Sequence, residues 1–195
     1  MSARPAARPE VLEFLLTRRS RPYKTLRLPV PTAEDLQPIL TAAARSPDHG
    51  ALVPFRFLVL ERAALARIAG MIEAAGSRLG RSDEDIAKQK GVYDMGNFAV
   101  AVVAAPVDSP KIPEIEQLYT AGAVCLALLN AAHAAGWGAN WMSGWASHDA
   151  AFRAEAFGLA PQERIAGIIH IGTETATPPD RPRPDLATLT TWVRT

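Results

Sequence analysis

The sequence predicts an α/β or α+β protein in which one β-sheet carries helices on its faces. Two apolar runs, Phe98–Ala104 and Ile165–Gly172, have the composition and length of buried strands. Stretches with helical periodicity alternate with such runs, and no repeat or internal linker interrupts them. The chain has 195 residues, the length of one domain, so we expect a single domain over residues 1–195.

Helix starts and stops in the first third of the chain follow from particular residues. Apolar residues at helical spacing predict a short helix over Val11–Arg18, after a frayed segment at residues 1–9. A capping-box pattern at Thr32–Asp35 begins a helix toward Arg45. Because Pro38 would remove a hydrogen bond inside that helix, we expect the helix to begin late or to bend.

The middle of the chain alternates loop, strand and helix signals. The turn residues of Pro47–Gly50 predict a loop, and Phe55–Glu61 has the composition of a buried strand. A helix over Arg62–Ala75 is expected to end at Gly76, since glycine commonly closes helices. The polar stretch Gly80–Lys90 predicts an exposed loop with a short helix.

The second half begins with the longest predicted helix, over Ile112–Ala135, which Gly136 ends. The Trp-rich segment Ala139–Trp145 predicts a short strand or an extended loop. Asp149–Phe157 then predicts another helix, and Ile165–Gly172 the last strand, which gives about four strands in all. The remaining tail is proline-rich and then briefly helical.

Composition excludes several classes of protein. With 21 basic and 20 acidic residues, the net charge of +1 argues against a general nucleic-acid binder. The single cysteine, Cys125, excludes an intrachain disulfide and fits the reducing cytoplasm. No secretory signal is visible. Polar residues and glycines interrupt the uncharged stretch Gln117–His148, so we expect a buried core helix there and no membrane span.

Metal and hydrolytic sites are not expected, and we name no catalytic side chain. The four histidines lack the spacing of metal ligands, and Ser143 lacks the preceding glycine of a nucleophile elbow. Gly136–Gly138 follows a helix and lacks the third glycine of a dinucleotide fingerprint. Cys125 and His133 lie about 12 Å apart along one helix, so both are interpreted as core residues.

Two clusters of arginine are candidates for anion binding. In Arg18–Arg21, an extended backbone would place Arg18 and Ser20 on one side, where guanidinium and hydroxyl donors suit a phosphate. In Arg181–Pro184, each arginine precedes a proline and is therefore biased toward extended conformations. Taken alone, such a cluster is more often a solvated surface run.

Two loops could supply the rest of a pocket. Gly50 allows a close approach of backbone to a ligand, and the neighbouring His49 can donate or accept a hydrogen bond. The segment Trp141–Trp145 combines flat rings with a hydroxyl and a glycine, as a planar ligand would need. The alternatives are a turn histidine and ordinary core or interface packing by tryptophan.

These pieces occur in the order found in one family. The sequence resembles the nitroreductase family of flavin enzymes, and is most similar to its small-chain branch of NAD(P)H oxidoreductases. Four segments carry the resemblance, from residue 18 to about residue 183: Arg18–Ser20, Ser46–Gly50 with Pro54–Phe57, Gly136 through Trp141–Gly144, and Phe157–Leu159 through Ile168 to Thr173.

The resemblance implies an α+β, nitroreductase-like three-layer fold with a central mixed sheet flanked by helices. It also implies an intertwined homodimer that binds FMN at the subunit interface. The FMN phosphate and ribityl chain would be held by Arg18, Arg19 and Ser20 from one end of the chain, and by Arg181 and Arg183 from the other.

The flavin ring contacts are implied in the same way. His49 and Leu52 would contact FMN across the interface, while Trp141, Met142 and Ser143 would lie against the ring system. Backbone amides near Ser143 would then face the ring edge and help to stabilise the charge of its reduced form.

The activity implied by this resemblance is an FMN-dependent NAD(P)H oxidoreductase. It would reduce nitroaromatics, quinones or similar small acceptors in two alternating half-reactions, with NAD(P)H as the electron donor. One alternative keeps FMN but changes the reaction, for example to dehalogenation or ene reduction. Another is a flavin-binding module without catalysis. The expected partners are a second copy of the chain and a small-molecule acceptor, with neither nucleic acid nor membrane.

Overall fold

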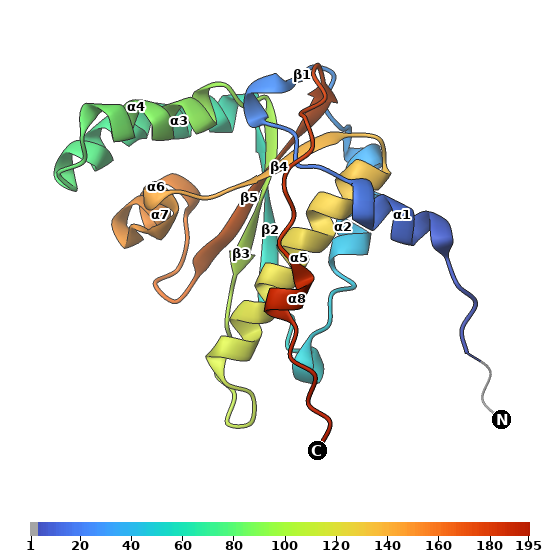
Figure 1. Cartoon of the computed structure of the whole chain (residues 1–195). Coiled ribbons are helices and arrows are strands. Elements are labelled where there is room, and N and C mark those ends of the chain that lie inside the picture. Colours follow the sequence, from blue (N-terminus) through green and yellow to red (C-terminus); the bar gives the residue numbers. More distant parts are fainter. Residues whose placement is uncertain (1–3) are drawn as a thin grey trace.

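The strand β3 (Phe98–Ala104) lies at the centre of the computed structural model, which describes residues 4–195. All of its residues are buried, as the continuous apolar run predicts. Because side chains alternate along a strand, Ala99 and Ala101 pack into one layer of helices and Val100 and Val102 into the other. The result is the expected three-layer arrangement of a sheet between helices (Figure 1).

The sheet has five strands, one more than the sequence predicts. β3 lies between β2 and β5, and β5 also pairs with β1 and β4. Every pairing among residues 4–195 is antiparallel, so the mixed sheet expected above is corrected in this respect. The missed strand has only two residues, too few for periodicity to detect. The strands besides β3 are β1 (Leu26–Arg27), β2 (Phe55–Glu61), β4 (Gly138–Met142) and β5 (Arg164–Glu174).

The helices divide between the two faces of the sheet (Figure 1). One core contains side chains from α3, α4, α6 and α7, and the other contains side chains from α2 and α5. Neither α1 nor α8 buries a residue. The bounds of the helices are α1 (Pro9–Thr17), α2 (Ala33–Ala43), α3 (Arg62–Arg78), α4 (Asp83–Asp94), α5 (Glu114–Ala134), α6 (Trp145–His148), α7 (Ala150–Phe157) and α8 (Leu186–Leu189).

Two helix boundaries differ from the sequence prediction. α3 continues through Gly76. This glycine does not end the helix but lets it pack against Ile86 of α4, where a side chain would collide. The helix ends instead before Gly80, whose φ of +63° is the left-handed conformation that favours glycine. α4 is a full 12-residue helix that begins after the N-cap Ser82, where the sequence predicts a short one in an exposed loop.

The observed starts of α1 and α2 also differ from the sequence prediction. α2 begins directly after the N-cap Thr32, with both hydrogen bonds of a capping box, so it does not begin late despite Pro38. α1 begins at Pro9, the last residue of the segment expected to be frayed. Residues 4–8 have no regular secondary structure, and residues 1–3 lie outside the described residues.

α5 is the one helix in the described residues that is long and apolar enough to cross a membrane. Its side chains at Val124, Cys125 and Leu128 are fully buried against the sheet. It is therefore the core helix that the sequence predicts for this stretch. Burial raises the pKa of the Cys125 thiol to about 12, in keeping with a structural role.

Candidate cofactor site

The first arginine cluster lies beside β4. In the segment that follows α1, the Arg21 amide donates a hydrogen bond of 2.8 Å to the carbonyl of Ala139 in β4. The Arg21 side chain forms an ion pair of 2.6 Å with Glu174 at the end of β5. These two contacts fix the segment that contains Arg18 and Ser20 against the edge of the sheet.

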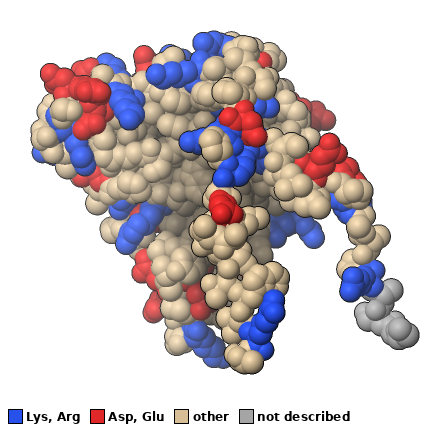
Figure 2. All heavy atoms as spheres, in the orientation of Figure 1, with Lys and Arg blue, Asp and Glu red and all other residues tan. Residues whose placement is uncertain are grey.

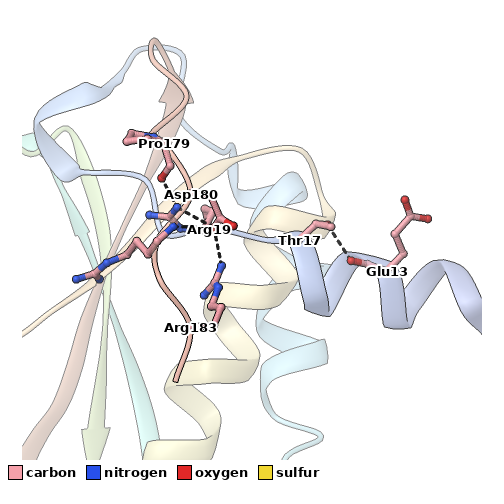
Figure 3. A network of polar contacts seen from close by, with 7 residues as sticks. Glu13, Thr17, Arg19, Pro179, Asp180 and Arg183 are labelled. Carbon is pink, nitrogen blue, oxygen red and sulfur yellow. Dashed lines mark hydrogen bonds and ion pairs between the residues drawn. The ribbon is translucent and has the colours of Figure 1, made fainter. Parts of the chain in front are cut away.

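The second arginine cluster meets the first, although about 160 residues separate them (Figure 3). Arg19 Nη1 donates to the carbonyl of Pro179 and, at 3.2 Å, to Oδ1 of Asp180. Arg183 Nη2 donates to the same carboxylate oxygen at 3.0 Å. Figure 2 shows basic and acidic side chains gathered where the C-terminal segment crosses this face.

A cavity of about 450 Å³ lies between the two clusters. It brings together the five residues that the family resemblance implies for the FMN phosphate, as well as Met142. It also includes residues that the sequence did not single out, which come from the start of the chain, from β4 and from the proline-rich tail. The cavity is lined by Arg18, Arg19, Ser20, Pro22, Tyr23, Asn140, Met142, Pro178, Pro179, Asp180, Arg181 and Arg183.

The electrostatics of this cavity favour an anion. Arg18 is half-buried, and its Nε atom has no hydrogen-bond partner among residues 4–195. Burial lowers the pKa of Arg18, and the positive charges of Arg183 and Arg19 lower it further. A ligand with several anionic oxygens would reduce the repulsion among these arginines and accept a hydrogen bond from Arg18 Nε.

β4 presents alternate residues to the cavity. Asn140 and Met142 line it, and they are two residues apart on one face of the strand. Trp141 faces the other way, and its indole lies over Gly167, where any side chain would collide with it. The period-two rule applied to this strand would have identified Asn140 from sequence.

Ser143 and His148 form a pair just beyond β4, with 3.2 Å between Ser143 Oγ and His148 Nε2. Both side chains are exposed. The next residue, Gly144, lies against Gln89 of α4, and a side chain at this glycine would collide with the Gln89 amide. The glycine therefore permits a close approach between α4 and the backbone that we expect at the ring edge.

The loop with His49 and Leu52 lies apart from the arginine cavity of the same chain. His49 Nδ1 lies 2.7 Å from Glu116 Oε2, near the start of α5. Arg18 instead shares a surface pocket with His133 near the end of α5, about five helical turns or roughly 25 Å along the axis. A single chain therefore does not bring His49 to the arginine clusters.

The backbone of this loop is held in an uncommon conformation. Gly50, Ala51 and Val53 have φ values of +74°, +53° and +51°. For a β-branched residue such as Val53 this is a strained conformation, which surrounding contacts must maintain. The Asp48 carboxylate accepts a hydrogen bond of 2.7 Å from the Val53 amide, and so holds the loop in shape.

Two further sequence expectations concern metals and core histidines. Among residues 4–195 there is no group of three or more His, Cys, Asp or Glu placed to hold a metal ion. His133 is only half-buried, and its Nε2 lies 3.1 Å from the Ala139 carbonyl, so it is less of a core residue than expected. Burial lowers the pKa of His133, the hydrogen bond to Ala139 opposes this shift, and the charges of Arg18 and Arg21 add to it.

Known proteins of one family are similar to this chain in sequence. The family model described as "Nitroreductase family" matches residues 15–173. An Escherichia coli K12 protein described as "Putative NAD(P)H nitroreductase YdjA" is 35% identical over 164 residues, which cover 84% of this chain and 88% of that protein. A Haemophilus influenzae protein with the same enzyme description is 36% identical over 166 residues, with the same shares of both chains.

Solved structures share the fold. A nitroreductase-like family protein from Bacillus cereus superposes with a TM-score of 0.76 at 20% identity, over 99% of this chain and 98% of that chain. A nitroreductase with bound FMN from Bacteroides fragilis gives a TM-score of 0.72 at 19% identity, over 95% and 99% of the two chains. With the family match over most of its length, this chain belongs to the nitroreductase family.

Proposed function

We propose that the protein is an FMN-dependent NAD(P)H oxidoreductase of nitroreductase type. The observation that carries this proposal is the meeting of both arginine clusters at one cavity, where Arg18 Nε lacks a partner among the described residues. The relatives described as NAD(P)H nitroreductases and the FMN-bound structural neighbour support the same assignment.

The residues present fit the phosphate of FMN. The charges of Arg19 and Arg183 are close enough to lower the pKa of Arg18, and these two arginines share the Asp180 carboxylate. Ser20 and Arg181 line the same cavity. Guanidinium groups bind phosphate oxygens in pairs, with short charge-assisted hydrogen bonds. We therefore assign these five residues to the phosphate end of the cofactor.

The strand β4 then directs the rest of the ligand. The cavity that Arg18 and Ser20 line also includes Asn140 and Met142 of this strand, and Ser143 follows Met142 in the chain. Bound FMN would supply the hydride chemistry between NAD(P)H and a small nitroaromatic, quinone or similar acceptor. The chain's contribution is to bind and orient the ligand, with Met142 against the ring and the amides after it at the ring edge.

We also propose that two copies of this single-domain chain form an intertwined dimer, which brings His49 and Leu52 to the flavin ring. The exposed apolar side chains support this proposal, since patches of this kind mark interaction surfaces. α1 and the C-terminal tail carry Val11, Leu12, Leu15, Leu16, Leu186, Leu189, Trp192 and Val193, each at least half exposed in one subunit. The free cysteine and the core role of α5 are in keeping with the cytoplasm as the site of action.

Flavin titration of the purified protein tests the proposal. The protein should be yellow, with flavin absorbance that NAD(P)H bleaches. Arg18→Met should weaken FMN binding by about 10- to 150-fold, the equivalent of a charge-assisted hydrogen bond of about 1.5–3 kcal/mol. Arg183→Met should have a smaller effect, because its side chain is 53% exposed. The exposed Arg45→Met is the matched control, and riboflavin, which lacks the phosphate, should not distinguish the variants.

The outcomes separate this function from its alternatives. A colourless protein that gains no stability from FMN would contradict the proposal. Binding of FMN without any NAD(P)H turnover would indicate a flavin-binding module. Turnover with a panel of acceptors would separate nitro or quinone reduction from dehalogenation or ene reduction.

A further inference from the structure

Asp180 lies within the arginine cavity and accepts hydrogen bonds from both ends of the chain. Its Oδ1 atom accepts from Arg19 Nη1 at 3.2 Å, from Arg183 Nη2 at 3.0 Å and from its neighbour's amide, Arg181 N, at 2.8 Å (Figure 3). The amide hydrogen bond, and then the two arginines, lower the pKa of Asp180. A carboxylate thus occupies the position between Arg19 and Arg183.

One carboxylate does not satisfy this cluster. Four arginine side chains line the cavity, and Asp180 contributes a single negative charge among them. Arg18 Nε keeps no partner within the described chain, and the pKa of Arg18 is lowered by burial and by Arg183 and Arg19. A phosphate monoester carries a charge of about −1.5 to −2 on three oxygens, so it would satisfy more of these donors than a carboxylate does.

We propose that Asp180 is an internal competitor for the phosphate of the bound ligand and thereby sets the affinity of this site. In the ligand-free protein its carboxylate bridges Arg19 and Arg183. When a phosphate monoester binds, Asp180 gives up at least one of these donors to it. This inference rests on the proposed function, and adds a residue that governs affinity at the same site.

The ion pairs of Asp180 with Arg19 and Arg183 are weak enough to be exchanged. The Asp180 side chain is 78% exposed, and exposed ion pairs are weak because water and salt screen them. Arg19 in contrast is 14% exposed and also donates to the Pro179 carbonyl. The tail can therefore stay attached through Pro179 while the carboxylate is exchanged for phosphate.

The test compares the full chain with Asp180→Asn, which keeps the size and the acceptor oxygen but removes the charge. FMN and riboflavin are titrated into the cofactor-free proteins. We expect Asp180→Asn to bind FMN about two- to five-fold more tightly, the worth of an exposed ion pair, with riboflavin binding unchanged. Asp185→Asn is the matched control, because Asp185 lies in the same tail and caps α8, a role that asparagine also performs.

A second readout needs no cofactor. Asp180, Arg181 and Arg183 are the residues of the segment 178–183 that carry a backbone amide hydrogen. Relative to their intrinsic rates, these amides should exchange faster in ligand-free Asp180→Asn than in the wild type, and at an unchanged rate in Asp185→Asn. Equal exchange in all three proteins would overturn the proposal. So would weaker FMN binding by Asp180→Asn, which would make Asp180 a positioning residue, or an equal change for riboflavin.

The proposed function can fail separately. If the wild type binds neither FMN nor riboflavin, the flavin assignment is wrong, and titration with inorganic phosphate then replaces FMN. Tighter phosphate binding by Asp180→Asn would still support Asp180 as an internal competitor, and unchanged or weaker binding would overturn it.

Discussion

His170 should make the protein sensitive to mild acid. This histidine lies in β5 with 2% of its surface exposed, and neither ring nitrogen has a hydrogen-bond partner among residues 4–195. Its ring lies against Gly96 and packs 5.9 Å from the ring of Tyr23. Burial lowers the pKa of His170 from 6.5 to about 4, because a charged imidazolium would lose its hydration there.

The sign and size of the effect follow from this difference in pKa. As the pH falls below 6.5, the unfolded chain takes up a proton at His170, whereas the folded protein does so only near pH 4. The unfolded state is therefore favoured over this range. Relative to pH 7, this residue should reduce the free energy of unfolding by about 2 kcal/mol at pH 5 and by at most about 3 kcal/mol below pH 4.

Urea unfolding at pH 7 and pH 5 measures this loss, with His170→Leu as the variant that cannot titrate. The variant should lose about 2 kcal/mol less than the wild type between the two pH values. His133, whose pKa is also lowered, acts in the same direction but contributes equally to both proteins. The carboxylates with lowered pKa, such as Glu163, lose their contribution mainly below pH 4.5. Equal losses in the two proteins would refute the reasoning.

Substitutions at three further positions test contacts that stabilise the fold. Arg56→Met should lower the free energy of unfolding by about 2 kcal/mol, because it removes the bidentate ion pair (2.5 and 2.8 Å) from Glu163, whose side chain is 10% exposed. An unchanged midpoint of urea unfolding would contradict this. Gly167→Ala should displace the indole of Trp141, shift tryptophan emission to the red and cost about 1–3 kcal/mol, whereas an unchanged spectrum would disprove the contact. Thr32→Ala should cost about 1 kcal/mol in thermal unfolding by removing the α2 cap, and Thr32→Ser should retain most of it.

Much of the fold follows from local signals in the sequence. The apolar run at β3 and the capping box at Thr32 each predicted an element that the structure contains. The helix end predicted at Gly76 was wrong, because a glycine can either end a helix or permit close packing. Only the contact with Ile86 in the folded protein shows that Gly76 permits close packing. β1 was missed because its two residues are defined by pairing with β5, not by their own composition.

The candidate site was predicted in parts. Arginine pairs and a Trp-rich strand are visible as residue types, so Arg18 and Met142 could be selected from the sequence alone. The side of the strand on which Trp141 lies depends on its phase relative to Gly167, and the role of Asp180 depends on its two distant arginine partners. Neither relation is a property of a local segment.

The sequence by itself determined the chemistry available to this protein: a surplus of arginine at both chain ends, apolar strands for a core, and the order of segments that resembles a flavin enzyme family. Only the tertiary structure decided that Arg19 and Arg183 share one carboxylate, and that His49 lies far from them beside Glu116. The physical reason is that hydrophobic burial, which is readable as a pattern, selects the layers of the fold. Contacts between charged groups at their edges depend on where the folded chain brings distant segments together.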